Sequence, residues 1–141
     1  MAIPDVDVNA LAVLVAAVIQ FAIGSLWYSN ILFGKAWMRY LGIDKKKLNS
    51  AQKKSMTGSY ILVFVGALVL NFVLAYIVKY MTASTFEQGM VAGLMVWIGF
   101  ILTSMLGMTL WEGKSYKLYL INVFYYLVSL LITGGLLASW H

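Results

Sequence analysis

The stretch GMVAGLMVWIGFILTSMLGMTLW, residues 89–111, has no charged side chain and is long enough to cross a ~30 Å hydrocarbon core as one helix. Three other runs share both properties, at residues 10–33, 59–78 and 118–140. A globular protein can bury one such helix, but four leave too little polar surface for a soluble particle. The sequence therefore predicts an all-α membrane protein with four transmembrane helices in one bundle.

Composition supports a single membrane domain over residues 1–141. The chain is 62% hydrophobic and 11% charged, and its connecting segments are too short to hold a soluble domain. The absence of cysteine excludes disulfides, thiolate metal sites and cysteine nucleophiles. A net charge of +5 would suggest nucleic-acid binding in a soluble protein. Here the basic residues flank the spans, so we expect no nucleic-acid partner.

The basic residues also predict the orientation. Nine of the ten Lys and Arg residues fall in two connections, residues 34–58 and 112–117. The opposite side carries only Lys79 among the basic residues, together with three acids. The positive-inside rule then predicts that both connections are cytoplasmic loops and that both termini lie outside. The first run lacks a basic flank and a cleavage pattern, which favours a retained helix over a secretory signal.

Capping chemistry marks the expected helix boundaries. Asn9, or one of the two aspartates before it, can cap the first helix. Ser84 and Glu87 have the spacing of a capping box before the third span. Gly113 followed by Ser115 predicts a helix stop and a new N-cap, and hence a tight hairpin.

A short segment after the first span alternates aromatic rings with cations. Lys35 and Arg39 lie four residues apart, so one helical face can meet lipid phosphates while the rings lie toward the acyl chains. The simpler interpretation is an ordinary aromatic belt, and the alternative is specific capture of an anionic lipid or another ligand. The interfacial lipid-contact candidates are Trp27, Tyr28, Lys35, Trp37, Arg39 and Tyr40.

Polar side chains are few within the spans. Gln20 and Asn71 lie near the middle of antiparallel neighbours, where an amide pair would contribute about 0.6–2 kcal/mol. Such a pair most simply holds two helices together, and the alternative is a polar site or the lining of a narrow pore. The intramembrane polar candidates are Gln20, Asn71, Thr103, Ser104, Asn122 and Tyr125.

Small residues along the third span predict close helix packing. Gly89 and Gly93 form a GxxxG pair, and Gly99, Thr103 and Gly107 follow at intervals of four. A helix lined in this way often has a partner subunit, so we expect a homo-oligomer of unspecified subunit number. A weak similarity between residues 34–41 and 113–120 leaves open whether the domain is two parallel hairpins.

The sequence offers little support for catalysis. No Asp, Glu, Lys, Arg or His lies inside the four runs, and the single histidine is His141. Glu112 follows the third run and can form an interfacial ion pair with Lys114. We therefore expect no enzyme activity, no cofactor and no metal. The buried carboxylate that small multidrug transporters require in their first span is also absent.

Several blocks of the chain resemble one protein family. Asn9, residues 24–28 (GSLWY) and residues 32–38 (LFGKAWM) resemble the signature of domain-of-unknown-function family 1761. Residues 111–115 (WEGKS) and 120–122 (LIN) resemble the second half of that family. The resemblance covers nearly the whole chain and implies a small bacterial inner-membrane protein. It supplies no activity, substrate or catalytic residue.

Two main classes of function follow. The first is a non-catalytic, self-associating membrane component that binds membrane lipid or partner helices. The second is a passive channel or carrier for a small neutral or apolar solute, built in an oligomer and lined by Gln20, Asn71 and Ser or Thr side chains. The first requires these amides in dry helix contacts and the second requires them in a water-filled space. A membrane enzyme is a third, weaker alternative.

Overall fold

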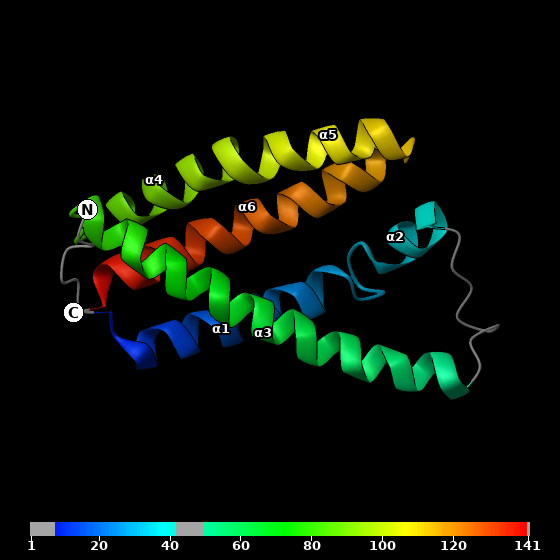
Figure 1. Cartoon of the computed structure of the whole chain (residues 1–141), viewed down its shortest axis with the longest axis horizontal. Coiled ribbons are helices and arrows are strands. Elements are labelled where there is room, and N and C mark those ends of the chain that lie inside the picture. The colour runs from blue at the N-terminus through cyan, green and yellow to red at the C-terminus, as the bar shows by residue number, and fades with distance from the viewer. Residues whose placement is uncertain (1–7, 42–49, 141) are drawn as a thin grey trace.

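The computed structural model describes residues 8–41 and 50–140 of the chain. In the described part every regular element is a helix, and four stretches are long and apolar enough to cross a membrane (Figure 1). This confirms the predicted fold class. The elements are α1 (Ala10–Trp27), α2 (Gly34–Leu41), α3 (Ser50–Tyr80), α4 (Phe86–Val96), the π-helix η2 (Trp97–Leu102), α5 (Thr103–Glu112) and α6 (Tyr116–Ser139).

The spans form two hairpins, and α6, which belongs to the second hairpin, is the central helix of the bundle. The α4–η2–α5 rod lies along α6, while α1 pairs with α3, and α6 also packs against both (Figure 1). The start of α1, the end of α6 and the α3–α4 turn lie at one end of the molecule (Figure 1). Helix α2 and the α5–α6 turn lie at the other end, which we call the basic end because it carries Lys35, Arg39, Lys114 and Lys117.

The caps at the helix ends follow local chemistry. The Asn9 side chain accepts hydrogen bonds from the backbone N–H groups of Leu11 (3.0 Å) and Ala12 (3.2 Å), as expected for an N-cap. Gly113 adopts a left-handed conformation after α5, and the Ser115 hydroxyl accepts from the Lys117 N–H at 3.2 Å. Both predicted signals of the α5–α6 turn are therefore present.

The capping box before α4 is one residue later than predicted. Thr85, not Ser84, is the N-cap, and its hydroxyl accepts from the N–H of Gln88 at 3.2 Å. The Gln88 amide oxygen in turn accepts from the N–H of Thr85, so Gln88 takes the role assigned to Glu87. Both residue pairs satisfy the same sequence pattern. Thr85 has the extended backbone that an N-cap requires, with φ −111° and ψ 160°.

The first helix is shorter than its apolar run. Helix α1 ends at Trp27, whereas the sequence predicts a span to residue 33. A turn follows, closed by hydrogen bonds from Phe33 N–H to the Trp27 carbonyl (3.0 Å) and from Gly34 N–H to the Ser29 carbonyl (2.8 Å). Ser29 and the asparagine after it favour such a turn, although the residues that follow them are apolar. Hydropathy alone does not detect this helix end.

The predicted cytoplasmic loop 34–58 is largely helical at its two ends. It contains all of α2 and the first turns of α3. The loop 112–117 is a tight turn, because α6 already begins at Tyr116. The lysine cluster Lys45–Lys47, the two N-terminal aspartates and His141 lie outside the described residues.

Glycine pairs bring α4 and α6 into backbone contact. A Cβ on Gly89 would collide with the carbonyl oxygen of Gly134, and a Cβ on Gly93 would collide with that of Leu130. In the opposite direction, a Cβ on Gly134 would meet the Gly89 carbonyl. Since lipid tails are as apolar as side chains, this close approach, and not expulsion of water, holds such helices together.

The remaining small residues of the third span do not continue this contact. In a continuous α-helix, Gly107 would lie about five turns after Gly89 and hence on the same face. The π-helix η2 intervenes, and its i→i+5 bonding rotates the following residues relative to an α-helix. Gly99 and Thr103 are exposed, and a Cβ on Gly99 or Gly107 would meet no atom within 4 Å. The close helix packing predicted for these residues is therefore not made within the described part of the chain, and packing against a second copy stays a prediction.

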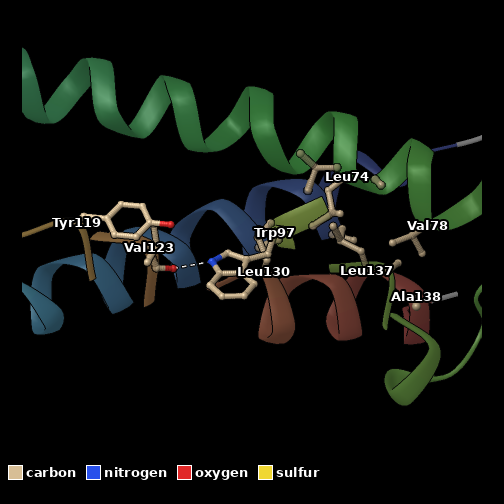
Figure 2. Close-up of a cluster of buried hydrophobic side chains, with 13 residues drawn as sticks. Leu74, Val78, Trp97, Tyr119, Val123, Leu130, Leu137 and Ala138 are labelled. Carbon is tan, nitrogen blue, oxygen red and sulfur yellow. Dashed lines mark hydrogen bonds between the residues drawn. The ribbon is translucent and has the colours of Figure 1, made fainter. Parts of the chain in front are cut away.

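The core runs along the middle of α6. Figure 2 shows Trp97 at its centre, with its indole N–H donating to the Val123 carbonyl at 2.7 Å. Leu74 and Val78 of α3 and Leu130 of α6 are almost fully buried in the same cluster. Trp97 thus joins η2 to α6, and Tyr119 reinforces this joint by donating its hydroxyl to the Leu102 carbonyl at 2.7 Å.

Candidate functional site

A groove of about 370 Å³ opens at the basic end, between the end of α1, α2, α5 and α6. Its lining combines aromatic, apolar and charged side chains. Many of the candidate residues that the sequence places in separate segments meet in this groove. The lining residues are Tyr28, Trp37, Met105, Met108, Thr109, Glu112, Lys114, Ser115, Leu118, Tyr119 and Asn122.

Two hydrogen bonds dock the turn after α1 onto α6. The Trp27 indole N–H donates to the Ile121 carbonyl at 3.0 Å, and the Tyr28 hydroxyl donates to Asn122 Oδ1 at 2.6 Å. Gly34 permits the tight return of the chain, because a Cβ at this position would collide with the Tyr28 carbonyl oxygen. These contacts fix the position of α2 beside the groove.

Tyr28 lies at the centre of an aromatic cluster. Its ring contacts Trp37 on one side and Tyr125 on the other, with centroid distances of 5.4 and 5.5 Å and tilted, edge-on geometry. Gly24 leaves room for this cluster, since a Cβ there would lie 3.1 Å from the Tyr125 hydroxyl. Burial raises the pKa of Tyr28 well above its usual value, and the neighbouring Tyr126 and Tyr125 raise it further. The Tyr28 hydroxyl therefore stays neutral and acts as a hydrogen-bond donor.

The rim of the groove carries the charges. Lys114 Nζ lies 3.3 Å from Glu112 Oε2, and both side chains are about half exposed, so this predicted ion pair contributes little to stability. On α2, outside the lining of the groove, an Arg39 guanidinium N–H donates to the Tyr40 hydroxyl at 3.3 Å. This bond and the nearby Lys117 ammonium lower the pKa of Tyr40, even though desolvation opposes the shift. Arg39 and Lys117, from α2 and α6, thus face the same hydroxyl.

The arrangement is suited to holding an amphiphile. The lining is largely aromatic and apolar, and its two charged residues, Lys114 and Glu112, offset each other. The cations Arg39 and Lys117, with which no described carboxylate pairs, do not line the groove but lie on α2 and α6 at the same end of the molecule. Asn122 Oδ1 accepts from the Tyr28 hydroxyl, and no described residue accepts from Asn122 Nδ2, which leaves amide donors at the groove. Among residues 8–41 and 50–140, no three His, Cys, Asp or Glu side chains gather in a way that would bind a metal ion.

The other intramembrane polar candidates lie elsewhere. Asn71 Nδ2 donates to Gln20 Oε1 at 2.7 Å, and Asn71 and Gln20 are only 0% and 5% exposed. Tyr125 donates to the backbone carbonyl of Gln20 at 3.3 Å. Thr103 and Ser104 face outward from the bundle, and Thr103 donates to its own helix at the Gly99 carbonyl. Neither residue belongs to the groove.

Sequence reasoning missed the α5 and α6 side chains that complete the groove. Met105, Met108 and Leu118 carry no chemical signal that separates them from other apolar residues of a span. Tyr119 offered a usable signal, because it precedes Asn122 by three residues and such residues share a helix face.

The two blocks that resemble a known family meet in space. Trp27 and Tyr28 belong to the first block, and their partners Ile121 and Asn122 belong to the second. Residues 11–138 match the family described as "Protein of unknown function (DUF1761)". No curated protein and no solved structure matches the chain. Because the matched residues span nearly the whole chain, the protein belongs to the DUF1761 family.

Proposed function

We propose that the chain is a non-catalytic, multi-pass component of the bacterial inner membrane that self-associates and binds membrane lipid. The observation that carries this proposal is the buried amide pair of Gln20 and Asn71. The two side chains bond to each other at 2.7 Å, and Asn71 also donates to the Ala67 carbonyl at 2.9 Å. Neither amide lines a described groove, so the pair supports helix association over solute passage.

The charge distribution supports a non-catalytic role. Charged residues of the described spans lie only in their terminal turns, as with Lys79, Glu87 and Glu112. A membrane enzyme ordinarily needs a charged or metal-bound group within reach of its substrate. The same distribution supports an orientation with the basic end in the cytoplasm and both termini outside.

Self-association is proposed to use the outward face of η2 and α5. Gly99, Thr103 and Gly107 are small, Gly99 and Thr103 are exposed, and a Cβ on Gly99 or Gly107 would meet no atom within 4 Å. Such residues let a helix of a second copy approach closely. The Thr103 hydroxyl is satisfied by the Gly99 carbonyl at 2.8 Å, so this face exposes no unpaired hydroxyl at that position.

Cross-linking in the membrane tests this proposal, because the chain has no native cysteine. We expect Thr103→Cys to form a disulfide-linked dimer under mild oxidation. Gly66→Cys is the matched control: Gly66 is also exposed, and a Cβ on it would also meet no atom within 4 Å, but it lies on α3. Dimers that form equally from both variants, or from neither, would refute self-association through α5.

A second pair of variants separates packing from cysteine chemistry. Replacing Gly99 with Leu in the Thr103→Cys background should abolish the dimer, because a large side chain prevents close approach. Gly66→Leu in the same background should leave the cross-link unchanged. Equal loss in both variants would show that the effect is not local to the proposed face.

A further inference from the structure

We infer that the groove at the basic end binds one anionic phospholipid of the phosphatidylglycerol type. This inference deepens the proposed function and rests on its lipid-binding part. The groove has a closed aromatic side, formed by Tyr28 and Trp37, and an apolar side, formed by Met105 and Met108 of α5. An acyl chain fits such a lining, because it has no polar group that would need a partner.

The cations at the basic end, beside the groove, specify the charge of the headgroup. Lys114 is paired with Glu112 at 3.3 Å, so this pair is close to neutral as a unit. Arg39 and Lys117 remain, and both act on the Tyr40 hydroxyl. No described carboxylate pairs with either of them. Arg39 and Tyr40 follow the lining residue Trp37 on α2, and Lys117 precedes the lining residue Leu118 on α6. A phosphodiester held beside the groove would therefore meet two cations and the Tyr40 O–H, which is the donor set that a phosphate accepts best.

The remaining polar groups suit a headgroup with hydroxyls. Asn122 Nδ2 has no described acceptor, and the half-exposed Glu112 carboxylate has free acceptor positions. A glycerol headgroup can donate to Glu112 and accept from Asn122. A choline headgroup has no N–H or O–H to donate, and a zwitterionic lipid gains less from the excess positive charge of the basic end.

Native mass spectrometry of the full-length protein tests the inference directly. The protein is released from micelles that contain equal amounts of phosphatidylglycerol, phosphatidylethanolamine and phosphatidylcholine with matched acyl chains. We expect one phosphatidylglycerol retained per chain, in preference to the other two lipids. Removing both free cations in Arg39→Gln/Lys117→Gln should weaken retention about 25-fold, since each cation near lipid phosphate contributes a factor of about five. Lys79→Gln, at the other end of the bundle, should change nothing.

A charge-preserving variant distinguishes a groove from a charged surface. Met108→Trp fills the groove, and Met108 is 60% exposed, so the substitution should not disturb folding. It should abolish phosphatidylglycerol retention, whereas Leu110→Trp, at a 72% exposed position of α5 outside the groove, should not.

Three results would overturn the inference. These are equal retention of all three lipids, full retention by Met108→Trp, and displacement of the lipid by inorganic phosphate, which would make free phosphate the ligand. The cross-linking of Thr103→Cys does not depend on the groove. Loss of lipid preference with intact cross-linking would therefore refute this inference alone, and loss of cross-linking would refute only self-association.

Discussion

The Gln20–Asn71 pair offers a quantitative test of a dry bundle. Replacing Gln20 with Leu leaves Asn71 Nδ2 with only the Ala67 carbonyl, and replacing Asn71 with Leu leaves the buried Gln20 amide without its partner. Once either partner is gone, the second substitution no longer breaks this bond. The double variant should therefore be less destabilised than the two single variants together.

The magnitude follows from the surroundings of the pair. Hydrogen bonds between membrane helices give coupling energies that average about 0.6 kcal/mol and reach about 1.7 kcal/mol. The 2.7 Å distance and full burial favour the upper part of this range, while Asn71 Oδ1, which has no partner in the described structure, lowers the net value. We expect a coupling of about 1 kcal/mol.

The assay is reversible unfolding in mixed micelles, followed by circular dichroism for the wild type, both single variants and the double variant. Gln20→Leu combined with Ser139→Ala is the control. The Ser139 hydroxyl donates to the Gly135 and Leu136 carbonyls of its own helix, so the destabilisations of these two substitutions should add within about 0.5 kcal/mol. A Gln20–Asn71 coupling indistinguishable from this control would refute the reasoning. It would mean that water satisfies both amides, as a conduit requires.

Three further predictions concern packing and the groove. Gly93→Val should destabilise the protein by about 3 kcal/mol, because its side chain meets the backbone of α6, whereas Gly66→Val should have little effect in the same unfolding assay. Tyr28→Phe should cost about 1 kcal/mol through loss of the hydrogen bond to Asn122, with the ring contacts kept, and an equal loss in an Asn122→Leu background would contradict this. The raised pKa of Tyr28 also predicts a pH dependence: above pH 10 the unfolded chain loses this proton while the folded chain retains it, so stability should fall as pH rises toward the folded pKa. Below pH 10 the stabilisation by neutral Tyr28 is fully present. Above pH 10 the free energy of unfolding should fall less steeply with pH in Tyr28→Phe than in the wild type.

The spans and most caps could be predicted from the sequence because their causes are local. Four uncharged runs determine where helices cross the membrane, and the Asn9, Gly113 and Ser115 signals depend only on adjacent backbone groups. The capping box lies one residue later than predicted. Ser84 and Thr85 begin equivalent sequence patterns, and Thr85 is the residue with the extended backbone of an N-cap.

The rest depends on how the helices rotate against one another. The π-helix η2 accompanies the burial of Trp97 against α6, and no local residue pattern predicts this π-helix. From η2 onward the glycines no longer pack against α6, since a Cβ on Gly99 or Gly107 would meet no atom within 4 Å. For the same reason, the residues that line the groove could not be predicted together from the sequence. Tyr28 and Asn122 were separate candidates, and their 2.6 Å contact follows from the return of the chain at Gly34.

The central claim is that the chain crosses the membrane four times with its basic end in the cytoplasm. Single cysteines at exposed positions of each end, Lys35→Cys and Glu87→Cys, report on this through labelling of intact cells with a membrane-impermeant maleimide. We predict that Glu87→Cys is labelled from outside and that Lys35→Cys is labelled only after permeabilisation. The reverse pattern would contradict the orientation, and labelling of both positions in intact cells would contradict the membrane-spanning bundle.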